Sequence, residues 1–99
     1  MFARVHVLQT TPEQHDQGLE IVRDHLLPYL RNTSGFRGLV RLDDREAGKT
    51  LVITLWADEQ ALENSGEAAE RFSELAAETS GATRLALDRY EATLFDLAP

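Results

Sequence analysis

Two stretches of sequence decide the fold: GFRGLVRL at residues 35–42 and LVITLWADEQAL at residues 51–62. The polar, glycine-containing residues 44–49 separate them, so the pair predicts two strands joined by a hairpin. The second stretch begins with six almost wholly apolar residues, which is typical of a central strand buried on both faces. Asp58 then predicts the N-cap of a helix that follows the strand directly.

The segment before this hairpin predicts a strand and a helix. Residues 2–9 favour a strand with apolar side chains on both faces. Thr11, Pro12 and Gln14 form a helix start, because Thr11 can cap, proline suits the first helical position and Gln14 completes a capping box. Pro28 lacks an N–H group, so we expect it to kink this helix.

The segment after the hairpin predicts a second helix and a last strand. We expect the helix to be interrupted at residues 64–66, because Asn-Ser-Gly breaks its apolar pattern, and to stop at residues 79–81. The last strand is expected from about Asp88. The resulting order βαββαβ predicts one ferredoxin-like α+β domain over residues 1–99, with a four-stranded antiparallel sheet whose first and third strands are central.

The helices of such a fold cover one face of the sheet, yet the central strands are apolar on both faces. An uncovered apolar face costs roughly 25 cal/mol for each Å² left in water. We therefore expect a homodimer in which two sheets pack face to face as a dimeric α+β barrel.

Composition excludes several kinds of partner and site. The net charge is −7, with 17 acidic and 10 basic residues and no cluster of Lys and Arg, so we expect neither a nucleic-acid nor a membrane partner. Arg37 and Arg41 fall on one face of the strand expected at residues 36–43, near acidic residues, and we expect ion pairs there rather than an anion site. Cysteine is absent, which rules out disulfides and thiolate chemistry. With no signal-peptide pattern and no membrane span, we expect a cytoplasmic protein.

The two opening stretches resemble the antibiotic biosynthesis monooxygenase domain of the dimeric α+β barrel superfamily. The shared pattern is a glycine–aromatic entry to the second strand, an apolar strand ending in Trp56, an acidic helix cap and Ala-Leu in the first helical turn. The resemblance implies a homodimer with a small cleft between helices and sheet. It also implies oxidation of a small aromatic or quinone-like substrate by O₂ without flavin, metal or haem.

Four residues are candidates for substrate binding. By resemblance, Trp56 lines the cleft, where its flat apolar face and N–H group suit an aromatic ligand. Tyr29 could hydrogen-bond a phenolate, Asn64 is expected near the cleft mouth, and Phe72 is expected in its wall. Each has a structural alternative, since the three aromatic residues also fit core positions and Asn64 fits a turn or a cap.

The histidines are the candidate catalytic bases, because imidazole exchanges a proton near neutral pH. His6 lies in a central strand and His25 lies on the first helix beside Pro28. His15 is in the first turn of that helix, where we expect it to be solvated. The three do not have a metal-binding spacing on one element, so we expect no metal site.

Some branches of the family fit this chain less well. The haem-degrading branch has a haem-ligating His on the second helix, where this chain has Gly66. The polar groups that hold phenols in anthrone-oxidising members are replaced by Val52, Leu55 and Leu62. Two other functions therefore stay open: a non-catalytic module that binds a small apolar ligand, and a His-dependent isomerase or cyclase of the same superfamily.

Overall fold

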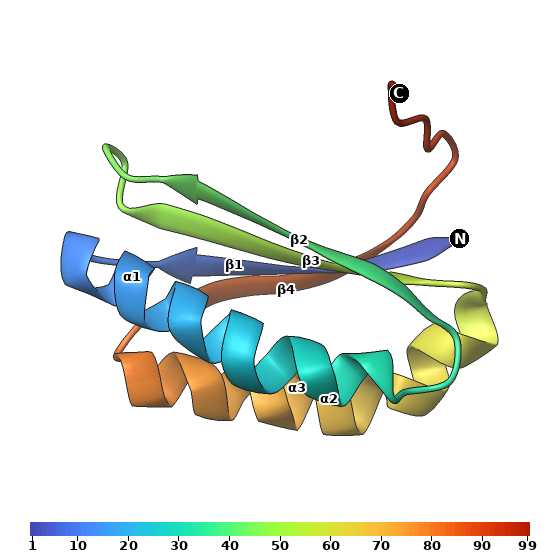
Figure 1. The fold of residues 1–99 in the computed structure, drawn as a ribbon, viewed down its shortest axis with the longest axis horizontal. Coiled ribbons are helices and arrows are strands. Elements are labelled where there is room, and N and C mark those ends of the chain that lie inside the picture. The colour runs from blue at the N-terminus through green and yellow to red at the C-terminus, as the bar shows by residue number, and fades with distance from the viewer.

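The chain forms an antiparallel sheet with helices packed on one face (Figure 1). The elements in chain order are β1 (Phe2–Gln9), α1 (Pro12–Ile21), η1 (Val22–Leu26), α2 (Leu27–Arg31), β2 (Phe36–Asp44), β3 (Lys49–Trp56), α3 (Glu59–Ser80) and β4 (Thr83–Glu91). This computed structural model describes the backbone of residues 1–99 and all side chains except those of residues 68, 69, 72, 73 and 75–77. The strand order is β2-β3-β1-β4, which confirms the predicted ferredoxin-like topology with β1 and β3 in the centre.

The predicted helix starts are present. The Thr11 side chain accepts a hydrogen bond from the Gln14 backbone N–H, and the Gln14 side chain accepts one from the Thr11 backbone. The Asp58 side chain accepts a hydrogen bond of 2.8 Å from the Ala61 N–H at the start of α3. Both caps satisfy N–H groups that the first helical turn leaves free.

A π-helical turn lies just before Pro28, where the sequence predicts a kink. Pro28 lies in the first turn of α2 and cannot donate a backbone hydrogen bond. Just before it, the Leu27 N–H bonds to the Val22 carbonyl five residues back, which closes the turn η1.

The expected interruption of α3 does not occur, because α3 continues as one helix through residues 64–66. Gly66 instead leaves room for a buried arginine. A Cβ atom at Gly66 would lie 2.7 Å from Nη2 of Arg4, which donates to the Leu62 carbonyl at 3.1 Å. The last strand also begins at Thr83, earlier than expected, because β4 pairs with β1 as far as Gln9.

The strand register separates two different sheet faces. The inner face, under the helices, mixes apolar and polar residues: Phe2, Leu8, Leu39, Val52, Trp56 and Leu87 share it with Arg4, His6, Arg41, Asp43, Thr50, Thr54 and Arg84. The outer face carries mostly apolar ones: Ala3, Val5, Val7, Val40, Leu42, Leu51, Ile53, Leu55, Ala86 and Tyr90. Apolar residues therefore occur on both faces, whereas a sheet with one solvated face normally keeps that face polar.

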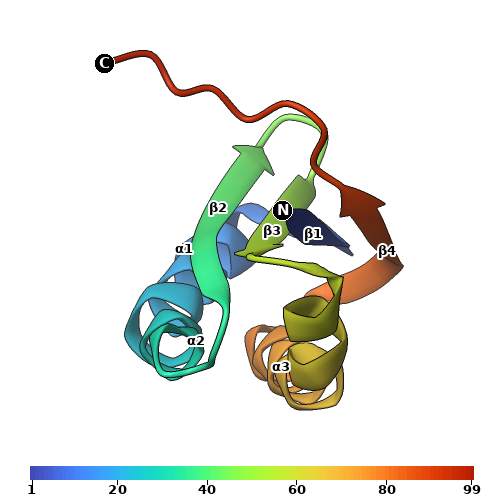
Figure 2. The ribbon, with the colours of Figure 1, turned by 90° about the vertical axis from the view of Figure 1, so that its right-hand side faces the viewer.

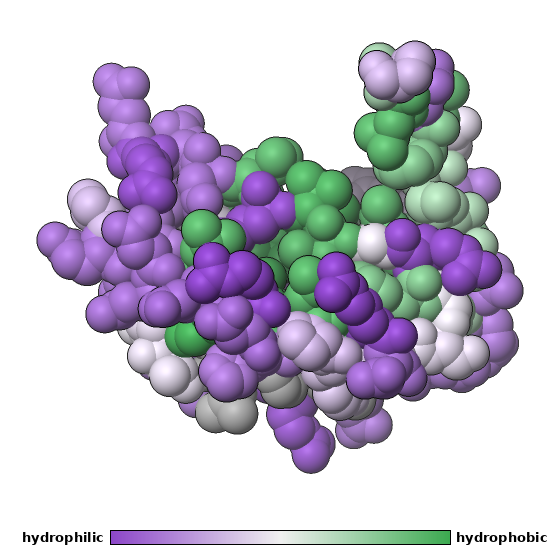
Figure 3. Space-filling model, in the orientation of Figure 1, coloured by the Kyte–Doolittle hydropathy of each residue, from purple (hydrophilic) through white to green (hydrophobic). Residues whose placement is uncertain are grey.

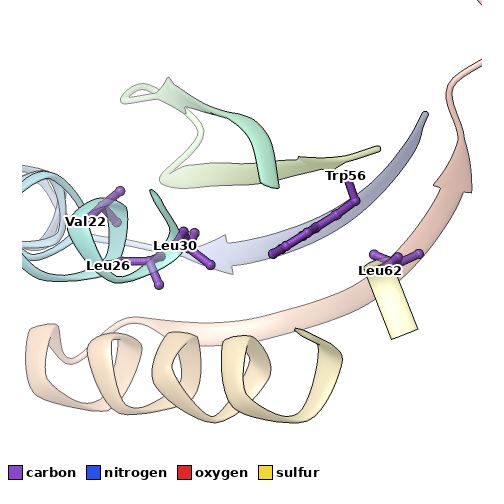
Figure 4. Close-up of a cluster of buried hydrophobic side chains, with 5 residues drawn as sticks. All are labelled: Val22, Leu26, Leu30, Trp56 and Leu62. Atoms are coloured by element: carbon purple, nitrogen blue, oxygen red, sulfur yellow. The ribbon is translucent and has the colours of Figure 1, made fainter. Parts of the chain in front are cut away.

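The core lies at the Trp56 end of the helical layer. The helices η1 and α2 contribute Val22, Leu26 and Leu30 to this core. These side chains pack with Trp56 of β3 and Leu62 of α3 (Figure 4). The phenyl ring of Phe36 packs edge-on against Trp56 with ring centroids 5.5 Å apart, and the indole Nε1 of Trp56 donates to Thr54 Oγ1 at 3.1 Å. Among the described residues, no helix is long and apolar enough to cross a membrane.

Candidate functional site

The cleft named the main cleft here lies between the helical layer and the inner face of the sheet. It encloses about 30 Å³ of free space, or about 490 Å³ when its open mouth is counted. The strands contribute His6, Leu8, Arg41, Val52 and Arg84. The helices and turns contribute Thr10, Gln14, Gly18, Val22, Leu26, Ser80 and Ala82. Figure 2 shows α1 and α2 beside α3, with these helices beneath the sheet. An apolar lining with a few polar groups is typical of small-molecule sites.

His6 lies in the middle of β1 and is 2% exposed. Burial lowers its pKa to about 4, and the charges of Arg4 and Arg84 act in the same direction. The imidazole is therefore neutral at pH 7, with one nitrogen able to donate and the other able to accept. The Nδ1 atom of His6 is buried and has no hydrogen-bond partner among the described groups. A buried polar atom without a partner indicates a ligand site more strongly than a paired one does.

The guanidinium group of Arg41, on β2, lies against Gly18 of α1 in the wall of the cleft. A Cβ atom at Gly18 would lie 3.0 Å from Nη2 of Arg41, so glycine lets the guanidinium approach the α1 backbone. Arg41 Nη2 donates to the His15 carbonyl at 3.1 Å and lies 3.4 Å from Asp43 Oδ1. The expected ion pair is present for Arg41. Its Nε atom is buried without a partner among the described groups.

Arg37 does not share this position, although the sequence predicts it on the same face. The register shifts between Phe36 and Gly38, and the bulge leaves Arg37 exposed, with Nη1 donating to the Phe36 carbonyl. A bulge of this kind turns one side chain out of the alternation.

Arg84 lies at the opposite edge of the sheet, on β4. Its Nη2 is 2.9 Å from Glu74 and 3.6 Å from Glu70, both on α3. Its Nη1 is buried without a partner among the described groups. The carboxylates compensate part of the charge of Arg84, which still lowers the pKa of His6, and Nη1 is left as a hydrogen-bond donor.

His15 belongs to a buried polar cluster at the end of the main cleft. It is fully buried, so the expectation of a solvated side chain is wrong. Its Nδ1 lies 2.9 Å from Asp43 Oδ1, its Nε2 lies 3.0 Å from Thr10 Oγ1, and Thr50 Oγ1 donates to Asp43 Oδ1 at 2.6 Å. Partial burial raises the pKa of Asp43, but hydrogen bonds from Thr50 and His15 and the charge of Arg41 outweigh it, so the net shift is downward.

Of the predicted site residues whose side chains are described, His6 alone lines the main cleft. Trp56 is fully buried in the core, which shares Val22 and Leu26 with the cleft wall. His25 on η1 is exposed, as is Tyr29 on α2, which is 39% exposed. Phe72 lies outside the described side chains.

Asn64 lies at a second cleft, between the start of α3 and the segment that precedes β2. Its Oδ1 accepts a hydrogen bond of 2.8 Å from Gln60 Nε2, and Asp58 and Arg37 are on the same rim. This second cleft is wider, at about 970 Å³ including open solvent. Among the described residues that line this second cleft, none has a buried side-chain donor without a hydrogen-bond partner, in contrast to the main cleft.

Reasoning from the sequence missed Thr10, Arg84 and the burial of His15. Each depends on contacts between residues far apart in the chain, such as the 28 positions that separate His15 from Asp43. A partial signal was available in the alternation of β2, which puts Arg41 and Asp43 on one face. Among the described residues, no group of three or more His, Asp or Glu side chains could hold a metal ion.

Comparisons with known proteins agree with this architecture. The family model described as antibiotic biosynthesis monooxygenase matches residues 1–77. The uncharacterised protein Rv2557 of Mycobacterium tuberculosis is 30% identical over 83 residues, which cover 84% of this chain and 37% of that protein. The chain therefore spans little more than a third of the length of this relative.

Two solved structures share the fold at low sequence identity. The monooxygenase from the gene ActVA-Orf6 of Streptomyces coelicolor, in complex with the ligand nanaomycin D, matches with a TM-score of 0.73 and 17% identity, covering 99% of this chain and 92% of that one. SnoaB, a cofactor-independent oxygenase from Streptomyces nogalater, matches with a TM-score of 0.68 and 13% identity, covering 95% of this chain and 94% of that one.

Proposed function

The chain belongs to the antibiotic biosynthesis monooxygenase family, and from that premise we propose that it is a cofactor-independent monooxygenase. The proposed substrate is a small aromatic or quinone-like molecule bound in the main cleft. The observation that carries the proposal is His6, a buried neutral imidazole with an unpaired nitrogen among the described groups, on the floor of a largely apolar cleft. The fold shared with a cofactor-independent oxygenase supports it.

The proposed reaction converts an activated methylene group of a phenolic substrate to a carbonyl group. The substrate first loses a proton and becomes an electron-rich anion, which O₂ then oxidises. The methylene carbon loses two hydrogens and gains one oxygen atom, and the second oxygen atom leaves as water. The substrate supplies the electrons, so the protein needs to bind the ring, handle protons and keep the cleft dry.

His6 is proposed to contact the oxygen-bearing part of the substrate. At pH 7 its neutral ring can donate to a carbonyl or phenolate oxygen through one nitrogen. Leu8, Val22 and Val52 supply apolar surface for the ring. Trp56 is proposed to support the cleft wall indirectly, because it packs in the same core as Val22 and Leu26. Its fluorescence can report binding because it is the only tryptophan.

We also propose that two copies pair through the outer sheet face. Val40, Leu42 and Tyr90 on that face are 41%, 49% and 57% exposed in one copy. Figure 3 shows a hydrophobic area between the polar end of the β2–β3 hairpin and the C-terminal segment. A second copy packed there would remove this apolar area from water and form the dimeric barrel expected from the sequence.

An oxygen electrode tests the activity with dihydroxyanthrones and hydroquinones as probes. We expect oxygen uptake by purified protein with no added cofactor. Turnover that persists without oxygen would favour an isomerase or cyclase. Quenching of Trp56 fluorescence by a probe without turnover would favour a binding module.

A matched pair of variants tests the place of binding. Ala82 and Ala57 are partly buried residues outside regular elements, and they line the main and the second cleft respectively. We expect Ala82→Phe to fill the main cleft and abolish most oxygen uptake, and Ala57→Phe to leave uptake within about threefold of wild type. The reverse result would move the site to the second cleft.

A further inference from the structure

We propose that the main cleft takes its aromatic ligand as an anion, with the ionised oxygen of a phenolate or a carboxylate held by Arg84 and His6. The proposal deepens the proposed function, because it names the charge of the substrate that the same cleft would bind. The probes that test it have no methylene group to oxidise. Binding of an anion and consumption of oxygen can therefore fail independently.

A bulge between β1 and β4 brings Arg84 to the inner face of the sheet. Regular alternation from Leu87 would place Leu85 on that face and Arg84 on the outer one. The register shifts at this point, so that Arg84 pairs with Leu8 in the cleft wall and Leu85 is left 57% exposed. The bulge therefore places a cation at the cleft where an apolar side chain would otherwise lie, and bulges near active sites often redirect a side chain in this way.

Unpaired hydrogen-bond donors gather at the same cleft. Of the four buried side-chain nitrogen atoms without a partner among the described groups, three belong to residues that line it: Nη1 of Arg84, Nδ1 of His6 and Nε of Arg41. The register places Val52 between His6 and Arg41, so these donors surround an apolar floor. Arginine nitrogens only donate, and Nδ1 of a neutral imidazole donates when it carries the hydrogen. A ligand that satisfies these groups needs acceptor oxygen atoms.

The ion pairs of Arg84 leave its donor available. Glu74 and Glu70 on α3 lie 2.9 Å and 3.6 Å from the same nitrogen, Nη2. Neither carboxylate is within ion-pair distance of Nη1, which is buried without a partner among the described groups. An ionised oxygen accepts a stronger hydrogen bond from a guanidinium than a neutral oxygen does.

The charge of the cleft lining is opposite in sign to that of the chain. The chain has a net charge of −7, yet the described residues that line the cleft include two arginines and neither Asp nor Glu. The charges of Arg4 and Arg84 both lower the pKa of the buried His6, so the local field at its ring is positive. This field favours an anion over a neutral ligand of the same shape.

The size of the cleft is compatible with such a ligand. The enclosed free space of about 30 Å³ is close to the volume of one water molecule in the liquid, and it suits an oxygen-bearing group. The open mouth, which brings the volume to about 490 Å³, would take the aromatic ring.

A purely structural role is the alternative, in which Arg84 only ties β4 to α3. Arg89 separates the two roles, because it lies on the same strand and 3.7 Å and 3.6 Å from Glu59 and Glu63 of α3. It is not among the residues that line the main cleft. A structural role predicts that Arg84→Met and Arg89→Met change ligand binding alike, whereas an anion site predicts that only Arg84→Met does.

The first arm of the experiment compares 2-naphthoate with its neutral amide, 2-naphthamide, by titration calorimetry at pH 7. We expect wild-type protein to bind the carboxylate at least about tenfold more tightly, the usual worth of a charge-assisted hydrogen bond. We expect Arg84→Met to reduce this preference to less than about threefold and Arg89→Met to keep it. Ala82→Phe, which fills the cleft, should weaken binding of both probes.

The second arm uses 4-nitrophenol, which absorbs visible light when ionised. We expect the pKa of the bound phenol to lie about 1 below that of the free phenol, because tenfold tighter binding of the anion lowers it by that amount. A preference in the first arm alone would identify a carboxylate site and in the second alone a phenolate site, and either supports the proposal. No preference by wild-type protein in either arm, or equal losses in the two arginine variants, would overturn it. The wild-type comparison decides even if Arg84→Met does not fold.

Discussion

At the scale of single residues, buried polar side chains lie on the inner face of the sheet, and two glycines in the helices leave room for them. Gly18 makes room for the guanidinium of Arg41, and Gly66 makes room for that of Arg4. His6 is held neutral first by its burial and then by the positive charges of Arg4 and Arg84, which an imidazolium would meet there. Keeping such groups buried costs stability, which is common where a site is prepared for a ligand.

The first prediction concerns the pH dependence of stability. The pKa of His6 is about 4 in the folded protein against 6.5 ordinarily, so the unfolded state binds more protons between these values. The free energy of unfolding should therefore fall as the pH is lowered from 7 to 4, by about 3 kcal/mol from His6 alone. Urea unfolding at a series of pH values measures this slope.

The control for this prediction is His6→Gln, which cannot titrate and should show a flatter profile over the same window. Asp43 acts at lower pH, because its lowered pKa stabilises the folded state above the ordinary carboxyl range and that contribution is lost as the pH falls through the folded value. A His6→Gln profile parallel to that of wild type would show that His6 is not buried in its neutral form.

Some residue positions could be predicted from sequence and others could not. His6, which is flanked by Val5 and Val7 in a central strand, pointed to the site, since the middle of such a strand offers it no solvent. His15 could not be placed, because a first-turn helical position is normally solvated and its partners Asp43 and Thr50 are distant in the chain. The bulge beside Arg37 likewise leaves no clear trace in the local alternation.

At the scale of elements, the connection from α2 into β2 fixes how the hairpin meets α3. Gly35 has a φ of 82°, and its carbonyl accepts a hydrogen bond of 2.8 Å from the Ala57 N–H. A Cβ atom there would collide with the Cβ of Ala61 at the start of α3. Glycine is required both by the left-handed backbone and by the close approach.

The second prediction follows from this contact. We expect Gly35→Ala to lower the free energy of unfolding by at least about 1–2 kcal/mol from backbone strain, with a further loss from the collision with Ala61. Gly38→Ala is the matched control, because its Cβ would lie an ordinary 3.8 Å from Leu55. Denaturant unfolding should find the control within about 1 kcal/mol of wild type, and equal losses in the two variants would refute the argument.

Local signals predicted most of the elements correctly. The capping box at Thr11, the cap at Asp58 and the bounds of β1 depend on neighbouring residues, and the structure shows all three. The continuity of α3 and the early start of β4 were missed because tertiary contacts decide them. Arg4 packs against Gly66, and Arg84 pairs with carboxylates of α3.

At the scale of the whole molecule, both faces of the sheet carry apolar residues. The outer face is mostly apolar and the inner face mixes apolar and polar side chains, which is consistent with a sheet that is covered on both faces. In the proposed dimer, the outer face would become the interior of a barrel. The main cleft would stay open on the helical side of each copy.

The third prediction tests this pairing with matched surface variants. Val40 on the outer face and Leu19 on α1 are both 41% exposed. We expect sedimentation to show a dimer for wild-type protein and for Leu19→Asp, and a monomer for Val40→Asp, because a carboxylate cannot be buried unpaired between two sheets. A wild-type protein that sediments as a monomer would contradict the proposed interface.

The most direct test of the proposed function follows the fate of oxygen atoms. Protein purified with a metal chelator is incubated with a dihydroxyanthrone that it consumes, under dioxygen labelled with heavy oxygen, and the product is analysed by mass spectrometry. The account predicts that the new carbonyl group carries one labelled oxygen atom and that Ala82→Phe suppresses its formation. A product without the label, or one formed equally well without dioxygen, would contradict it.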